Sequence, residues 1–337
     1  MQRSDYLIRR VFFALATLVV VIGFNFFLFR ILPGDPIKSI ARSPRLTREA
    51  REKLRVDFGL DKPVFFDGER LRKGDVLGAF DTQFTAYVRA LLHGNLGISY
   101  RSRRDVAEVL AERVWRTVVL VAGAETLALL FGVVLGLVSA WRRGTRLEMT
   151  ILLWALISWG LPNFFLGIIL LLLARGHLPV GGMATPGLKP EHGLAYWADV
   201  GRHLILPTLT MAIVYTSSYV LIMRSSVVEV LSEDYILTAK AKGLNTFQIL
   251  RDHALKNAML PMVTMVALNL AYTVGGAIQV ETVFSWPGIG RLMYDSVQLR
   301  DYPILQGTFL LLALSVIVAN LLADLLYSVL DPRVKAE

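Results

Sequence analysis

The sequence contains no cysteine among its 337 residues. This absence excludes disulfide bonds and thiolate metal sites, although it does not indicate a compartment. The chain also lacks any Gly-Lys pair, so it has no G-x-x-x-x-G-K-[ST] loop to hold the phosphates of ATP. Neither H-E-x-x-H nor G-x-S-x-G occurs, and the five histidines lack metal-ligand spacing. These absences predict a non-catalytic protein with no metal and no cofactor of its own.

Charged residues are scarce, at 19% of the chain, where a soluble domain has about 25%. Hydrophobic residues reach 54%, and several apolar runs are near the ~20 residues that cross a bilayer. The composition therefore predicts an all-α polytopic membrane protein. The net charge of +9 could indicate nucleic acid, but many basic residues stand beside predicted spans, as the positive-inside rule describes. We expect membrane lipid and no nucleic acid as a partner.

Six apolar stretches are predicted to be transmembrane helices, over about residues 11–32, 117–140, 150–173, 203–223, 262–281 and 304–330. Arginines precede the first span and follow the second and fourth, which predicts a multi-pass protein with both termini in the cytoplasm. Val11–Phe29 is too long for most signal-peptide cores, so we interpret it as a retained span. Gly160-Leu161-Pro162-Asn163 interrupts the third span and predicts a kink there.

The predicted organisation has four parts. Residues 1–36 form the tail and first span, 37–113 a polar extracytoplasmic segment, 114–331 a transmembrane domain of five spans, and 332–337 a cytoplasmic tail. The polar segment is basic, but long loops cross the membrane largely regardless of their charge, so we place it outside. Within it, residues 68–81 look like a local insertion for which the sequence suggests no counterpart.

The most polar long run of the second half, residues 232–261, predicts a hairpin of two short helices. Ser232 is expected to cap the first helix, because a hydroxyl can accept from the free N–H groups of a first turn. Lys240 and Lys242 suit its last turn, where the helix dipole favours cations. Gly243 is placed to adopt the left-handed conformation that ends a helix.

The second helix of this hairpin is predicted to begin at Asn245. Gln248 stands three positions later, so the two side chains can form a capping box. Pro261 follows where the next apolar run resumes. A capped hairpin between two membrane spans is a rigid projection, and we expect another protein to dock on it.

Two stretches of this hairpin resemble a known family: DYILTAKAKGL (234–244) and HALKNAMLP (253–261) are similar to the cytoplasmic EAA loop of the membrane subunits of bacterial ABC importers. Leu237-Thr238-Ala239 stands where the Glu-Ala-Ala would be, and Gly243 lies farther from Pro261 than in the general pattern. Both departures are usual in the dipeptide/oligopeptide permease branch. Further stretches resemble that branch: LPGDP (32–36), FGLDKP (58–63), HGNLGIS (93–99), FSWPGIG (284–290), RDYPILQG (300–307) and DLLYSVLDPR (324–333).

The resemblance implies a six-helix type I ABC importer permease fold, with an extracytoplasmic insertion after the first helix. It implies a permease that imports dipeptides or oligopeptides across the bacterial cytoplasmic membrane. The implied partners are a second homologous permease, an extracytoplasmic peptide-binding protein, and two ATPase subunits that bind ATP and Mg. ABC permeases for nickel or oligosaccharides are alternatives, as is an ion-driven secondary transporter.

The resemblance also implies site residues in two places. The ATPase-coupling residues would be Asp234, Tyr235, Ala239, Ala241, Gly243, His253, Asn257 and Pro261. The turn containing Trp286, Pro287 and Gly288 would face outward, near where the binding protein docks. An interfacial aromatic belt is an adequate alternative explanation for Trp286.

Three polar residues inside predicted spans are candidates for the substrate pathway: Glu125, Asn163 and Asn269. A carboxylate at the bilayer centre costs about 2.5–3.5 kcal/mol on insertion scales, so Glu125 should face a cavity or a partner. Hydrogen bonds between helices are the alternative role for all three residues. Gly132 and Gly136 form a G-x-x-x-G pattern, which predicts close packing of two helices.

Overall fold

The computed structural model describes residues 3–31, 49 and 61–330. Regular structure in these residues is helical, apart from one isolated bridge between Ile98 and Asp105. The expected all-α fold is thus observed. The predicted turn at 32–36, the helix-like piece at 47–58 and the tail at 332–337 lie outside the described residues.

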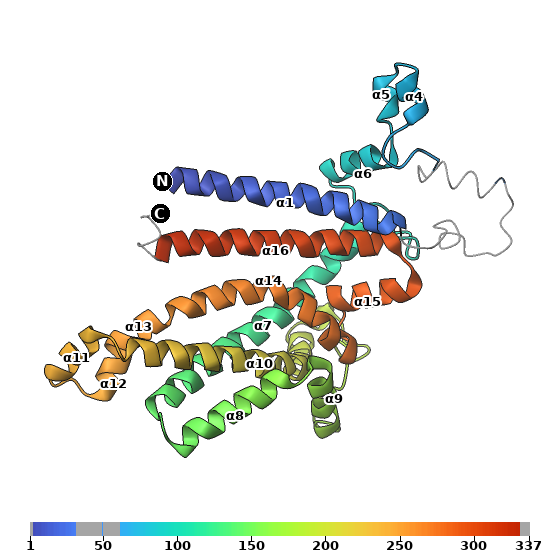
Figure 1. Cartoon of the computed structure of the whole chain (residues 1–337). Coiled ribbons are helices and arrows are strands. Elements are labelled where there is room, and N and C mark those ends of the chain that lie inside the picture. Colours follow the sequence, from blue (N-terminus) through green and yellow to red (C-terminus); the bar gives the residue numbers. More distant parts are fainter. Residues whose placement is uncertain (1–2, 32–48, 50–60, 331–337) are drawn as a thin grey trace. The chain divides into compact units, whose positions relative to one another are not determined.

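Helices follow one another along the chain as Figure 1 labels them. Their bounds are α1 Arg3–Ile31, α4 Gly68–Arg72, α5 Val76–Ala79, α6 Gln83–Leu92, α7 Val106–Trp141, α8 Arg146–Gly160, α9 Asn163–Leu173, the short 3-10 turn η1 Pro190–His192, α10 Leu194–Val230, α11 Asp234–Ala241, α12 Thr246–Gln248, a π-helical segment Ile249–Ala254, α13 Leu255–Ala258, α14 Leu260–Val283, α15 Ile289–Leu299 and α16 Tyr302–Leu330.

Within the described residues, four helices are long and apolar enough to cross a membrane: Ile8–Phe29, Val106–Trp141, Leu194–Val230 and Tyr302–Leu322. Helices α8 and α9 form a fifth candidate if they count as one span. Helix α14, with 24 residues, occupies the place of the predicted fifth span. The multi-pass character is therefore clear, whereas the count of six spans stays a prediction.

The predicted kink in the third span is a sharp break, because the helix axis bends by 107° between α8 and α9. Leu161 ends α8 in an extended conformation with ψ 126°. That is the conformation a residue adopts before proline, and Pro162 has no N–H to continue the helix. The sequence thus places the break correctly, and the chain changes direction there.

The residues group into two compact units. Unit 1 comprises Met1–Phe12, Trp115–Arg291 and Ser315–Glu337, and unit 2 comprises Phe13–Val114 and Leu292–Leu314.

In unit 1, one face of α7 carries a small residue at every fourth position: Ala124, Ala128, Gly132, Gly136 and Ala140. A Cβ atom on Gly136 would stand 2.6 Å from Cβ of Met223 in α10, and one on Gly132 would overlap Cβ of Tyr219. Only glycine allows this approach, so the G-x-x-x-G pattern packs α7 against α10 as predicted. Helix α8 adds Ile151 and Ala155, which pack in one buried cluster with Val220 of α10.

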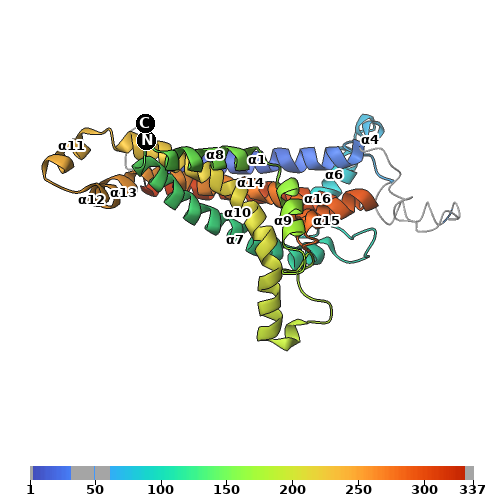
Figure 2. The same ribbon diagram turned by 90° about the horizontal axis from the view of Figure 1, so that it is seen from below.

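Helix α10 begins earlier than the sequence suggests. The predicted span covers residues 203–223, but α10 starts at Leu194, and Tyr196 and Val200 are buried in the unit 1 core. Polar residues in this first part of the helix hide its periodicity. Figure 2 shows α10 changing direction along its length, and it contains Pro207, whose ring removes a backbone hydrogen bond.

In unit 2, two stretches that resemble the peptide permeases meet each other. The carboxylate of Asp301 accepts a hydrogen bond from Ser99 Oγ at 2.6 Å, and it also accepts from the backbone N–H groups of Tyr100 and Arg101. A buried carboxylate with three donors fixes the loop after α6 onto the turn before α16. Asn25 of α1 donates to the backbone oxygen of Gln306 in α16 at 3.0 Å.

Candidate functional site

The hairpin between α10 and α14 has the predicted two arms and the predicted stop. Helix α11 ends at Ala241, and Gly243 has a φ of +82°. The predicted cap at Ser232 is wrong. Glu233 occupies the capping position without a side-chain bond, and Ser232 Oγ instead donates back to the Glu229 carbonyl at 2.6 Å. The chain leaves α10 in a tight turn, in which the Ser232 hydroxyl is bonded to the Glu229 carbonyl and so does not cap α11.

The capping box of the second arm is present. Asn245 N–H donates to Gln248 Oε1, and Gln248 N–H donates to Asn245 Oδ1, each at 2.9 Å. The arm then runs through the π-helical segment Ile249–Ala254 into α13. Pro261 stands in the first turn of α14, where a missing N–H costs nothing.

A small apolar core holds the two arms together. Ile236 and Ala239 from α11 and Ile249 from the second arm are buried there. Tyr235 and Asn257, both predicted to couple to an ATPase, contact each other, with Asn257 Nδ2 donating to Tyr235 Oη at 2.7 Å. Ala239 is only 4% exposed. It therefore stabilises the hairpin from inside and offers no surface to a partner.

The second arm is also joined to the spans of unit 1. Leu250, Ala254 and Ala258 are buried against α10, in a cluster that includes Met223 and Val227. The hairpin projects from the common end of α10 and α14 in both views (Figures 1 and 2). Because one arm belongs to the span core and the other packs on it, a force on the projection would reach α10 directly.

The outer surface of the hairpin combines apolar and charged side chains. Leu237 is 62% and Phe247 56% exposed, and Asp234, Ala241 and Pro261 are exposed as well. Arg251 binds Asp252, and this hydrogen bond lowers the pKa of the Asp252 carboxyl. Leu237 and Phe247 were not among the residues predicted from the sequence to couple to an ATPase. The available signal was that both are large apolar residues inside a polar stretch.

Glu125 and Asn269 are brought together, although no sequence pattern linked them. The Tyr219 hydroxyl of α10 donates to Glu125 Oε1 of α7, and Asn269 Nδ2 of α14 donates to the same hydroxyl at 3.1 Å. Glu125 is 5% exposed, and its Oε2 has no hydrogen-bond partner among the described residues. Three helices thus meet at one polar cluster, and Tyr219 is the member that sequence reasoning missed.

Asn163, the third pathway candidate, stands at the first position of α9, beside the break after α8. Its Oδ1 is buried with no hydrogen-bond partner in the described part of the chain. No hydrogen bond found there joins it to the Glu125 cluster. The structure therefore brings together two of the three candidates.

The turn after α14 is held inside unit 1. Trp286 is fully buried, and its indole N–H donates to the Arg116 carbonyl at 3.1 Å. An interfacial belt position is therefore wrong for this side chain, and its ring cannot touch a binding protein directly. Arg116 in turn donates to the Pro287 carbonyl at 3.3 Å. Of the three predicted docking residues, only Pro287 is partly exposed, because Gly288 is buried too.

A buried carboxylate organises this turn. Glu281 is 0% exposed and accepts from Thr117 Oγ1 at 2.6 Å and from Arg291 N–H at 2.9 Å. Thr117 Oγ1 also accepts from Ile289 N–H at 2.8 Å. Gly288 lies so close to the Glu281 carboxylate that a Cβ atom would overlap it. One satisfied polar network thereby ties α7, at Thr117, to the C-terminal end of α14 and the turn that follows it.

Within the described residues, no group of three or more His, Asp or Glu side chains could hold a metal ion. His253 is half-buried in the π-helical segment of the hairpin. The hairpin and the polar clusters therefore offer surfaces for docking, packing and polar contact.

Comparison with known proteins gives a family match over most of the chain. Residues 132–336 match the family described as "Binding-protein-dependent transport system inner membrane component". Residues 3–121 match the family described as "Binding-prot-dependent transport system membrane comp, N-term".

Several curated proteins are similar along the whole chain. The dipeptide transport system permease protein DppB of Escherichia coli (strain K12) is 35% identical over 350 residues, covering 98% of each chain. A putative peptide permease protein of Brucella suis biovar 1 (strain 1330) is 35% identical, with 98% of each chain covered. The glutathione transport system permease protein GsiC of Escherichia coli (strain K12) is 36% identical, covering 98% of this chain and 99% of GsiC.

One solved structure supports the fold alone. A chain of the MetNI methionine ABC transporter, in inward-facing conformations, aligns with a TM-score of 0.52 at 16% identity. The alignment covers 66% of this chain and 96% of that chain.

Proposed function

Because the chain belongs to the family of binding-protein-dependent transport system inner membrane components, and is therefore an ABC importer permease, we propose that its substrates are dipeptides and short oligopeptides. The observation that carries this proposal is the similarity to DppB, GsiC and a putative peptide permease over 98% of this chain. Glutathione is itself a tripeptide, so all three relatives point to one substrate class. The chain is a non-catalytic membrane subunit, and ATP is bound by partner subunits.

The partners would be an extracytoplasmic peptide-binding protein, a second permease and two ATPase subunits. The hairpin 232–261 would be the surface on which an ATPase subunit docks. Its support is geometric: the hairpin projects from the spans, carries exposed Leu237 and Phe247, and is joined to α10 through Leu250 and Ala254. Closure of the ATPases on ATP would push this projection, and the spans would rock between inward-open and outward-open states. Such an equilibrium shifts only through different binding free energies in the two states.

The Glu125 cluster would line part of the substrate route. Its support is the buried Glu125 oxygen that has no hydrogen-bond partner among the described residues, at the meeting point of α7, α10 and α14. A peptide carries a terminal ammonium group, which such a carboxylate attracts. With the hairpin on the cytoplasmic side, both termini would be cytoplasmic and residues 37–113 extracytoplasmic.

The test of substrate class is reconstitution of the permease with its second permease, its ATPases and its binding protein in proteoliposomes. We expect di- and tripeptides to stimulate ATP hydrolysis and to accumulate inside. Nickel ions and an oligosaccharide serve as competing substrates in the same preparation. If either of these is transported while peptides are not, the peptide assignment is wrong, although the chain remains an ABC permease.

The coupling role has a test of its own. Leu237→Asp places a charge on the exposed hairpin surface, and we expect it to reduce the amount of ATPase subunit that co-purifies. Glu191→Gln, in the exposed loop before α10, is the control and should retain the ATPase. Equal retention in both variants would argue against docking at this surface.

A further inference from the structure

The short helices α4 and α5 form a pair with a satisfied backbone and almost no core. Asp67 accepts from the N–H groups of Glu69 and Arg70 at 3.0 and 3.2 Å, and Asp75 accepts from Gly78 N–H at 2.9 Å. Asp67 N–H donates to the Ala79 carbonyl at 2.9 Å and closes the base. No residue of α4 is buried, and Ala79 is the buried residue of α5. The pair is thus ordered by caps rather than by packing.

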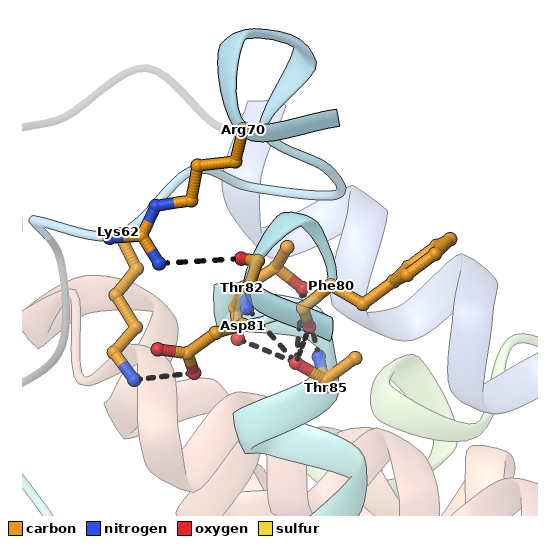
Figure 3. A network of polar contacts seen from close by, with 7 residues as sticks. Lys62, Arg70, Phe80, Asp81, Thr82 and Thr85 are labelled. Carbon is orange, nitrogen blue, oxygen red and sulfur yellow. Dashed lines mark hydrogen bonds and ion pairs between the residues drawn. The ribbon is translucent and has the colours of Figure 1, made fainter. Parts of the chain in front are cut away.

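The side chains of this pair and its flanks leave an apolar surface uncovered. Five large apolar residues within 15 positions are exposed: Phe66 63%, Leu71 46%, Val76 56%, Leu77 90% and Phe80 55%. Single exposed apolar residues are ordinary, but five on so short a segment leave more apolar area uncovered than scattered residues do. Figure 3 shows Phe80 pointing away from the polar network at the base of the pair.

The pair is attached at the end of a candidate membrane span. Phe65, just before α4, packs on Phe26 of α1 with ring centroids 5.7 Å apart, and on Phe27 at 6.4 Å. Phe26 and Phe27 lie near the end of the candidate span Ile8–Phe29. Within unit 2, the pair lies level with this end of α1 and to its side, rather than beyond it, in both views (Figures 1 and 2). If Ile8–Phe29 crosses the bilayer, that level is the interface between lipid headgroups and acyl chains.

The charges of the pair suit a phospholipid headgroup. Its aspartates are used internally, because Asp67 and Asp75 are caps and Asp81 binds Lys62 at 2.7 Å (Figure 3). Arg72 and Lys73 are exposed, and their side chains enter no hydrogen bond or ion pair in the described part of the chain. Two unoccupied cations beside an apolar surface are the composition of a segment that lies in a membrane interface.

We propose that the α4–α5 pair is a membrane-interface anchor. Leu77, Phe66 and Phe80 would enter the acyl region of the leaflet at the C-terminal end of α1, and Arg72 and Lys73 would bind lipid phosphates. This contact would hold the outer end of α1 and the α6 segment against the bilayer surface. The occupant is phospholipid, and the inference does not depend on which peptide is transported.

The absence of cysteine makes a direct test possible. Leu77→Cys, labelled with an environment-sensitive fluorophore, is placed with the full-length permease in nanodiscs containing phosphatidylglycerol. Because Leu77 is 90% exposed, the substitution removes no packing within the chain. We expect quenching by lipids that carry a shallow doxyl group, and about tenfold less quenching by aqueous iodide than at a water-exposed site.

Glu108→Cys, an exposed polar position at the start of α7 in the same unit, is the matched control and should show the opposite pattern. Arg72→Gln with Lys73→Gln should reduce doxyl quenching at Leu77→Cys in discs with phosphatidylglycerol. In discs of phosphatidylcholine alone the double variant should have little effect. Each cation near an anionic membrane surface strengthens membrane binding about fivefold, and this gain is lost when the lipid carries no net charge.

Two outcomes would overturn the proposal. In the first, iodide quenches the label at residue 77 as strongly as at residue 108, while doxyl lipids do not quench it. In the second, neither quencher reaches the label once the binding protein or the second permease is added, whereas the label is not protected before that addition. That result would identify the pair as a protein-docking surface instead.

Discussion

A single substitution at Gly243 can distinguish two roles for residues 232–261, a hairpin that couples to an ATPase and a passive linker between spans. Its φ is +82°, and a Cβ atom built there meets nothing within 4 Å. Gly243→Val therefore introduces backbone strain without any collision. A non-glycine residue in this region costs about 1–3 kcal/mol, and a β-branched one lies at the upper end.

The strain should displace one arm and leave the hairpin folded. Burial of Ile236 and Ile249 contributes about 1.5–3 kcal/mol for each side chain, which together exceeds the strain. The second arm is buried against α10 through Leu250 and Ala254, so α11 is the arm that must move. If the ATPase requires the native angle, its affinity should fall by about fivefold to 150-fold.

The assay measures peptide uptake and bound ATPase subunit in the same preparation, with the amount of permease in the membrane as the reference. Gly243→Asn should lose less, because asparagine tolerates a positive φ. Gly187→Val carries the same kind of strain in the loop before α10, at φ +96° with open space around it, and should retain the ATPase. Normal uptake and normal ATPase retention in Gly243→Val would refute the coupling role.

Three further predictions concern the spans and their orientation. Glu125→Gln keeps an acceptor but removes the charge, so uptake should fall about tenfold while the complex assembles normally; normal uptake with a less stable complex would assign Glu125 a structural role. Thr117→Val removes a donor to Glu281 and the acceptor of Ile289 N–H, so thermal unfolding of the purified protein should show a loss of about 1–3 kcal/mol, which Thr117→Ser should largely avoid. Asp81→Cys should react with an impermeant thiol reagent in intact cells without an outer barrier, since the Asp81 side chain is 51% exposed; labelling only after lysis would reverse the proposed orientation.

Features that depend on neighbours in the sequence could be predicted well. The Asn245–Gln248 box and the left-handed Gly243 are correct because each depends on residues three or four positions apart. The break at Pro162 is correct for the same reason. The cap at Ser232 failed although it is also local, because its hydroxyl had a competing acceptor at Glu229.

Features that depend on tertiary contacts could not be predicted. Nothing in the spacing of Glu125, Tyr219 and Asn269 says that their helices meet at one level. Trp286 follows a predicted span, so docking of a binding protein and an interfacial belt were both open to it. Its burial depends instead on tertiary contacts, with the unit 1 core and with the Arg116 carbonyl of another helix. Hydropathy reports that a residue prefers to avoid water, and it does not distinguish lipid from protein as the surroundings.

The contact between α7 and α10 restricts how the spans can move. At Gly132 and Gly136 no side chain of α7 separates its backbone from Tyr219 and Met223, so neither helix can slide without steric overlap. We expect the two helices to tilt together as a single body. Any opening across the membrane would then form along seams lined by larger side chains, such as the one between α10 and α14. The part of the α7–α10 seam at Gly132 and Gly136 would stay closed to water throughout the transport cycle.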